Sequence, residues 1–180
     1  LAAPKSGAFA TPLGNIALDT AALARLTDLP QVVFSDHAHA QEHSLEVHLP
    51  FLQRVLDDFT LVPLAVGHAT PRDVAEVLYL LWGGPETLIV ISSDLSHFLP
   101  YAAANQVDRD TCQHILQLDT DIRPEQACGA YPINGLLLAA RRRGLAPQLI
   151  HRCNSGDTAG DRQRVVGYAA FVFHEAADHD

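Results

Sequence analysis

Branched apolar runs and a helical repeat alternate in the middle of the chain. Two apolar runs, 59–66 and 87–91, are bounded by glycine or proline and rich in branched residues, which predicts two buried strands. Between them, apolar residues recur at helical spacing over 71–82, with Thr70 as the expected N-cap and Pro71 in the first turn. The pattern therefore predicts a strand–helix–strand unit.

The remaining apolar patterns predict further helices and strands. Helical spacing indicates helices over 19–27, 41–56, 102–118 and 134–143, and short apolar runs indicate strands over 31–35, 145–152 and 167–174. Elements that alternate in this way favour an α/β fold, a three-layer α/β/α sandwich with a mixed, mostly parallel sheet. No repeat, low-complexity tract or linker interrupts the sequence, so we expect residues 1–180 to form a single domain.

Composition and charge narrow the class of protein. The 180 residues are 48% apolar and 18% charged, which is ordinary for a soluble globular domain with a real core. A net charge of −9 argues against nucleic acid as a partner, because phosphate binding needs clustered Lys and Arg. The basic cluster at 141–143 follows an apolar helical run, where cations suit a helix C-terminus. No run reaches the roughly 18 apolar residues that span a bilayer, so we expect no membrane partner.

The cysteines bear on the redox compartment. Cys112, Cys128 and Cys153 are odd in number and widely spaced, which fits neither a disulfide framework nor a CxxC zinc site. We therefore expect a reducing compartment and a cytoplasmic location. A preceding segment with a targeting signal stays open, because the chain begins with Leu1 and contains no Met.

A polar segment opens the helix expected over 41–56. In helical geometry His43 and Glu46 share one face, and Ser44 and His48 lie on the next. Such a face could hold a metal or bind a substrate, although it matches neither HExxH nor HxxEH. A solvated polar face at a helix start explains the same pattern equally well.

A second polar segment, ISSDLSHF, follows the apolar run at 87–91 directly. The sheet would deliver Asp94 and His97 to its rim, where the imidazole could act as a general base oriented by the carboxylate. Ser92 or Ser93 could instead be a nucleophile, but the G-x-S-x-G elbow is absent. Under a purely structural interpretation, Ser93 and Asp94 cap the turn and the following helix.

A Cys-Gly turn and a glycine-rich loop complete the candidate chemistry. Cys128 precedes an expected helix, whose dipole favours a thiolate, so it is a candidate metal ligand or redox thiol, whereas Cys112 sits inside a helical pattern and is expected to pack. A buried free cysteine is the structural alternative for Cys128. The loop at 154–162 lacks phosphate-binding spacing and is expected to be a mobile rim loop.

Taken in order, the segments EHSLEVHLPF, ISSDLSH, CGAYPINGLL and GYAAFVF resemble the Memo family over residues 10–173. That family also supplies protein B of the AmmeMemoRadiSam system. The resemblance implies the LigB-type fold of class III extradiol dioxygenases, with a pocket where those enzymes hold a non-haem iron. The LigB/Memo-like sandwich is therefore the expected architecture.

The resemblance also implies roles for individual residues. Cys128 matches the family's cysteine metal ligand, and His97, with Asp94 beside it, falls on the general-base histidine of the dioxygenases. The family's two ligand histidines, in PHAGY-like and GPSHH-like motifs, do not occur in this sequence, so we expect the chain to lack the family's N-terminal part. The signature segments around the pocket also contain His43, Glu46, His48, Ser93 and Tyr168.

The function implied by the resemblance is that of a metal-binding redox protein. Iron or copper suits mixed imidazole and thiolate ligands, and zinc stays open. With Cys128 as its lone family ligand, the chain would bind metal weakly or not at all. The alternative is a non-catalytic adaptor that binds a small molecule or peptide through the same pocket. The implied partners are a radical-SAM protein and an AMMECR1-like protein. A serine hydrolase would need Ser93, His97 and Asp94 to be mutually hydrogen-bonded.

Overall fold

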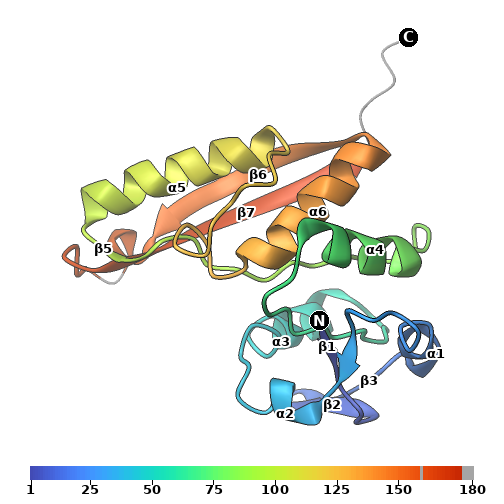
Figure 1. Ribbon diagram of the computed structural model, residues 1–180. Coiled ribbons are helices and arrows are strands. Elements are labelled where there is room, and N and C mark those ends of the chain that lie inside the picture. Colours follow the sequence, from blue (N-terminus) through green and yellow to red (C-terminus); the bar gives the residue numbers. More distant parts are fainter. Residues whose placement is uncertain (159, 176–180) are drawn as a thin grey trace. The chain divides into compact units, whose positions relative to one another are not determined.

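The computed structural model describes residues 1–158 and 160–175 (Figure 1). Contacts divide the chain into two compact units, one made of Leu1–Ala69 and Tyr79–Ser92 and the other of Thr70–Leu78 and Ser93–Asp180. Both units contain helices and strands, which confirms a mixed α/β chain. The expectation of a single domain over 1–180 stays a prediction.

The first unit is built from short elements. Its parallel pair joins β1 to β4, and its antiparallel pair joins β2 to β3. The helix predicted over 19–27 forms only as α1, which Asp19 caps by accepting a hydrogen bond from Ala22 N at 2.8 Å. The elements are β1 (Ala2–Ala3), β2 (Ala8–Thr11), β3 (Gly14–Ala17), α1 (Thr20–Ala24), β4 (Val33–Phe34), α2 (Asp36–His39) and α3 (Leu49–Val55).

The two strands predicted around residues 59–66 and 87–91 do not form, and this part of the sequence prediction is wrong. In the first segment, Leu61 and Ala65 make isolated bridges only, and the described chain has no strand pairing over the second. A ladder needs a neighbouring strand to accept and donate along its length. Leu88 is 66% exposed, so this apolar run is not buried between two layers.

Helix α4 (Pro71–Leu81) confirms the helix predicted over 71–82. Its start is a reciprocal cap: Asp73 N donates to Thr70 Oγ1 at 3.2 Å, and the Asp73 carboxylate accepts from Thr70 N at 2.8 Å. The helix buries one apolar face, made of Val74, Ala75, Val77 and Leu78.

The second unit is a long antiparallel hairpin with helices packed along it. Strands β6 and β7 form the hairpin, β5 pairs with the other edge of β7, and α5 and α6 contact the hairpin (Figure 1). Both strands and both long helices were predicted, with shifts of a few residues at their ends. The elements are β5 (His97–Leu99), α5 (Tyr101–Leu116), α6 (Ala130–Arg143), β6 (Leu145–Asn154), the 3₁₀ helix η1 (Ser155–Asp157) and β7 (Val165–Glu175).

The strand directions differ from the expected architecture. Among the described strands only β1 and β4 run parallel, and the three-stranded sheet β5–β7–β6 is antiparallel. The mostly parallel, three-layer sandwich is therefore not confirmed. Parallel neighbours need a crossover of about a dozen residues or more, usually a helix. The connection between β6 and β7 is short and, over its described residues 155–158 and 160–164, holds only η1, so the two strands run antiparallel.

Helix α6 explains the basic cluster and packs closely on α4. Its last turn contains the three arginines at 141–143, as predicted, and Gly144 ends it in the left-handed region with φ 69°. A Cβ added at Gly135 would overlap the Val74 side chain, so the small residue permits the approach of the two helices within this unit. Across the described residues, every helix is too short or too polar to cross a membrane.

Candidate functional site

The segment 93–97 is held in place by two neighbouring elements. Leu95 N donates to Gly167 O at 2.8 Å, and Gly167 N donates to Ser96 O at 2.9 Å, so β7 fixes the backbone from one side. On the side of α5, the Asp108 carboxylate accepts a hydrogen bond from Ser96 N at 3.0 Å. These bonds set the backbone from which Asp94 and His97 extend.

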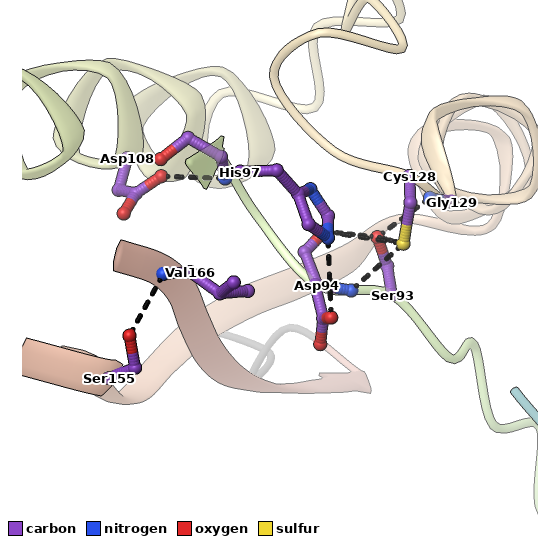
Figure 2. Close-up of polar contacts among 9 residues, drawn as sticks. Ser93, Asp94, His97, Asp108, Cys128, Gly129, Ser155 and Val166 are labelled. Atoms are coloured by element: carbon purple, nitrogen blue, oxygen red, sulfur yellow. Dashed lines mark hydrogen bonds and ion pairs between the residues drawn. The ribbon is translucent and has the colours of Figure 1, made fainter. Parts of the chain in front are cut away.

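An irregular strand start places the His97 side chain. His97 pairs with Val166, and the register then shifts before Leu99, which marks a bulge. Phe98 inside the bulge has φ 60°, a backbone region that is rare for aromatic residues. Bulges re-aim side chains beside them. The His97 imidazole points to Asp94, and its Nε2 lies 3.4 Å from Asp94 Oδ2 (Figure 2).

Cys128 meets the same segment from the start of α6. Asp94 N donates to Cys128 Sγ at 3.2 Å, and Ser93 Oγ lies 3.7 Å from the sulfur (Figure 2). Ser93 also accepts a hydrogen bond from Gly129 N at 2.8 Å and donates to Asp94 O at 2.6 Å. The predicted Cys-Gly turn at a helix start is confirmed, and the Ser93 hydroxyl ties it to the Asp94 backbone.

Three side chains of different chemistry therefore converge. One ligand atom from each of Asp94, His97 and Cys128 lies within 4.8 Å of the other two, and over residues 1–158 and 160–175 this is the one such group able to hold a metal ion. Asp94 and His97 are half-buried, and Cys128 is exposed. Three protein ligands with an open side match the usual number in catalytic metal sites, and this donor set suits iron, copper or zinc.

Comparisons with known proteins identify the family of this chain. The family model described as "Memo-like protein" matches residues 1–172. The chain belongs to the Memo family. A MEMO1 family protein of Desulfurococcus amylolyticus is 32% identical, and one of Sulfolobus acidocaldarius is 34% identical. Each alignment covers 93% of this chain and 64% of the relative, so the chain spans about 64% of the length of these Memo proteins.

Tyr168 is electrostatically linked to the cluster of this Memo chain. It lies on β7, is 39% exposed, and is the cross-strand partner of Cys153. Burial raises the pKa of the Tyr168 hydroxyl, and the Asp94 carboxylate and the Cys153 thiol raise it further. Tyr168 was expected from the GYAAFVF segment, and its role in the pocket stays a prediction.

The EHSLEVHLPF segment does not form the predicted helical face. Residues 44–48 form turns, and α3 begins only at Leu49. The Glu42 carboxylate accepts from the backbone N–H groups of His43 and Ser44, each at 2.9 Å, and the bond from Ser44 is the main cause of the lowered pKa of Glu42. His43 and Glu46 are exposed.

The histidine at the end of that segment has a different neighbour. His48 Nε2 lies 3.0 Å from Ser92 Oγ, and both residues are half-buried in the first unit. Asp94, His97 and Cys128 belong to the second unit. A shared role of His43, Glu46 and His48 with the cluster stays a prediction.

The serine hydrolase alternative receives no support from the hydroxyl contacts. Ser93 Oγ bonds to Gly129 N and Asp94 O, and Ser92 Oγ lies against His48. In the described part of the chain, no hydrogen bond joins either serine to His97. The required mutual bonding of serine, histidine and aspartate is therefore not observed.

The residues that fix the backbone of the segment 93–97 by hydrogen bonds were not predicted from the sequence. Asp108 and Gly167 fix the backbone next to His97, and Gly129 anchors Ser93. A signal for Asp108 was present, because it occupies the apolar face of α5. The other buried positions of that helix are Ala104, Thr111, Cys112 and Ile115.

Proposed function

We propose that this chain contributes the Cys128 metal ligand of a Memo-family redox protein, with His97 and Asp94 beside the metal. The observation that carries the proposal is the convergence of a carboxylate, an imidazole and a thiol within 4.8 Å. A redox metal such as iron or copper is well served by a soft thiolate together with a borderline imidazole. Membership in the Memo family supports the same function.

The contacts of Cys128, Asp94 and His97 indicate a separate role for each residue. Cys128 offers its sulfur from the start of α6, where Asp94 N already donates to it at 3.2 Å. The Asp94 carboxylate orients the His97 imidazole, whose Nε2 holds or releases a proton or joins the ligand set. A bound iron or copper would supply one-electron chemistry at this position.

We extend the proposal to a full-length Memo domain, because the relatives are longer than this chain. The LigB-type three-layer sandwich is the proposed architecture of the full domain, with further ligands from residues outside this chain. Dioxygenase chemistry on a catechol is the precedent of that fold. A thiolate in place of a carboxylate changes the charge and softness at the metal, so the proposed chemistry is metal-dependent redox in general.

The proposed setting is that of component B of the AmmeMemoRadiSam system in the cytoplasm. Its proposed partners are a radical-SAM protein, an AMMECR1-like protein and a small molecule whose structure the sequence does not specify. These proposals follow from the family resemblance, and the Asp94–His97–Cys128 cluster is their chemical basis in this chain.

A non-catalytic adaptor is the second candidate, and one observation favours it. Phe98, next to His97, is 60% exposed, and Tyr168 is 39% exposed. Aromatic side chains at a polar, half-open site are typical of surfaces that bind peptides or flat ligands. An adaptor of this kind would bind its ligand with no metal and would catalyse no redox reaction.

Metal analysis separates the two candidates. The chain is loaded anaerobically with Fe(II) or Cu(I), passed through a desalting column, and analysed for metal per chain. We expect more bound metal in the unaltered chain and in Cys153→Ser than in Cys128→Ser, because the chain holds only part of the proposed ligand set. His97→Ala and Asp94→Ala separate the roles, because removal of a ligand lowers the metal content, whereas removal of an acid/base group leaves it unchanged. Absence of metal from every form would leave the adaptor as the function.

A further inference from the structure

A buried polar cluster lies directly behind His97. Asp108 on α5 is 1% exposed, Ser96 is 0% exposed, and Asn154 at the end of β6 is 1% exposed. All three meet β7 at Gly167: Asn154 is its cross-strand partner, Ser96 O accepts from its N–H, and a Cβ at this glycine would overlap the Asp108 carboxylate. The unit therefore buries a charged residue beneath its candidate site.

Burial of a carboxylate needs a compensating role. Desolvation of a charged group is costly, and an apolar residue at the same place on α5 would pack without that cost. The Asp108 carboxylate accepts a hydrogen bond from Ser96 N at 3.0 Å. Ser96 is the residue immediately before His97. The hydrogen bond to Asp108 therefore holds the backbone one residue before the one that carries the imidazole.

The backbone conformation after His97 indicates why the hydrogen bond between Asp108 and Ser96 N is needed. Phe98 adopts φ 60° in the bulge, and such a conformation persists only where the surroundings over-determine it. β7 holds the segment through Gly167, and Asp108 is the restraint from the opposite element. With only one of the two restraints, the backbone leading into His97 could rotate and the imidazole would turn away from Asp94.

We propose that Asp108 is a positioning residue for His97: through the Ser96 N–H it fixes the Leu95–Ser96 peptide so that the imidazole faces Asp94 and Cys128. The consequence for metal affinity rests on the proposed function of the cluster. The placement of His97 does not, because it can be measured in the metal-free chain.

Substitutions at Asp108 and one matched control test this role. Asp108→Leu removes the acceptor, whereas Asp108→Asn keeps an acceptor oxygen at the same distance. Thr111→Val is the control, because Thr111 lies on the same buried face of α5, and its hydroxyl donates to Val107 O of its own helix and accepts a long bond of 3.4 Å from Gln126 Nε2 but, within the described structure, forms no hydrogen bond with Ser96. NMR of the metal-free chain reports the exchange rate of the Ser96 amide and the NOEs between the His97 ring and Cys128.

The expected results form a pattern that general destabilisation would not produce. Asp108→Leu should speed exchange of the Ser96 amide by about tenfold, the effect of one lost hydrogen bond, and should abolish the His97 NOEs. Asp108→Asn should restore both, and Thr111→Val should leave both unchanged. Retention of the NOEs in Asp108→Leu would overturn the proposal, and so would their loss in Asp108→Asn.

Two further readouts cover the remaining outcomes. If Asp108→Leu does not fold, Asp108→Glu, which displaces the carboxylate by one methylene, must shift the His97 ring signals relative to Asp108→Asn; identical signals would overturn the proposal. Co²⁺ titration should show about tenfold weaker binding in Asp108→Leu and recovery in Asp108→Asn. If the unaltered chain binds no Co²⁺, the proposed metal function fails, while the NMR results still decide the role of Asp108.

Discussion

Substitution of Ser93 by alanine should lower both the local stability of the start of α6 and the metal affinity of the Asp94–His97–Cys128 cluster. The hydroxyl accepts from Gly129 N at 2.8 Å and donates to Asp94 O at 2.6 Å. Gly129 is buried and is the N-cap of α6, and Ser93 Oγ is the acceptor that its N–H has in the described structure. Ser93→Ala therefore removes two bonds and leaves one buried donor unpaired.

The size of the effect follows from these contacts. A typical hydrogen bond contributes about 1 kcal/mol net, and an unpaired buried donor costs about 1–3 kcal/mol. We expect the opening free energy of the first turns of α6 to fall by about 2 kcal/mol. Since Asp94 N and Cys128 Sγ are 3.2 Å apart in the same linkage, Co²⁺ affinity should fall by about tenfold.

Hydrogen exchange of the α6 amides is the suitable assay, because the chain has two compact units and need not unfold in one step. Ser92→Ala is the matched control: its hydroxyl contacts His48 in the first unit, so α6 protection and Co²⁺ affinity should stay unchanged. Equal α6 exchange in the two variants would refute the assignment of Ser93 as the link between the two segments.

Three further predictions concern packing, pH and backbone strain. Gly135→Ala should cost about 1–3 kcal/mol by overlap with Val74, and Val74→Ala should recover part of that loss in urea unfolding of the double variant; strict additivity would contradict the contact. Burial raises the pKa of the Cys112 thiol from 9.0 to about 11, so the unfolded thiol ionises first and stability should fall between those pH values by up to about 3 kcal/mol. Urea unfolding of Cys112→Val should show a smaller loss of stability between these pH values. An unchanged dependence of the unfolding free energy on pH would contradict the role of the Cys112 thiol. Phe98→Asn should cost less than about 0.5 kcal/mol and Phe98→Val about 1–2 kcal/mol in thermal unfolding, because φ 60° suits asparagine and not a branched residue; the reverse order would remove the strain argument.

Elements with a strong internal pattern could be predicted from the sequence. The apolar face of α4 and its Thr70 cap are local features, and both are confirmed. Helix α6 begins at Ala130 and not at residue 134, because Pro132 stands in its first turn, where the missing N–H costs nothing. The apolar repeat becomes visible only after that turn.

Elements that depend on distant partners could not be predicted in the same way. The run at 87–91 is apolar, but its backbone has no neighbouring strand in the described structure, and apolar content alone does not create a ladder. In the 41–56 segment, the Glu42 side chain binds the backbone of His43 and Ser44, and such local bonds compete with a helix.

At the candidate site too, local features could be predicted from the sequence and contacts between distant segments could not. Asp94 and His97 were identified because they follow the apolar run at 87–91, which does not form the expected strand, and Cys128 because it precedes a helix. Their convergence depends on the pairing of β5 with β7 and on the Ser93 contact with Gly129, which no local pattern encodes. Asp108 was missed because the helix over 102–118 was predicted as a whole, and its contact with Ser96 N joins two segments that no local pattern connects.

Cobalt absorption spectroscopy tests the central claim most directly, since a bound thiolate gives Co²⁺ an intense near-ultraviolet charge-transfer band. Co²⁺ is titrated into the unaltered chain, Cys128→Ser and the control Cys153→Ser, and the band is followed to saturation. The account predicts a saturable band in the unaltered chain and in Cys153→Ser, and its loss in Cys128→Ser. A band that survives in Cys128→Ser, or no band in the unaltered chain, would contradict a metal site at Asp94, His97 and Cys128.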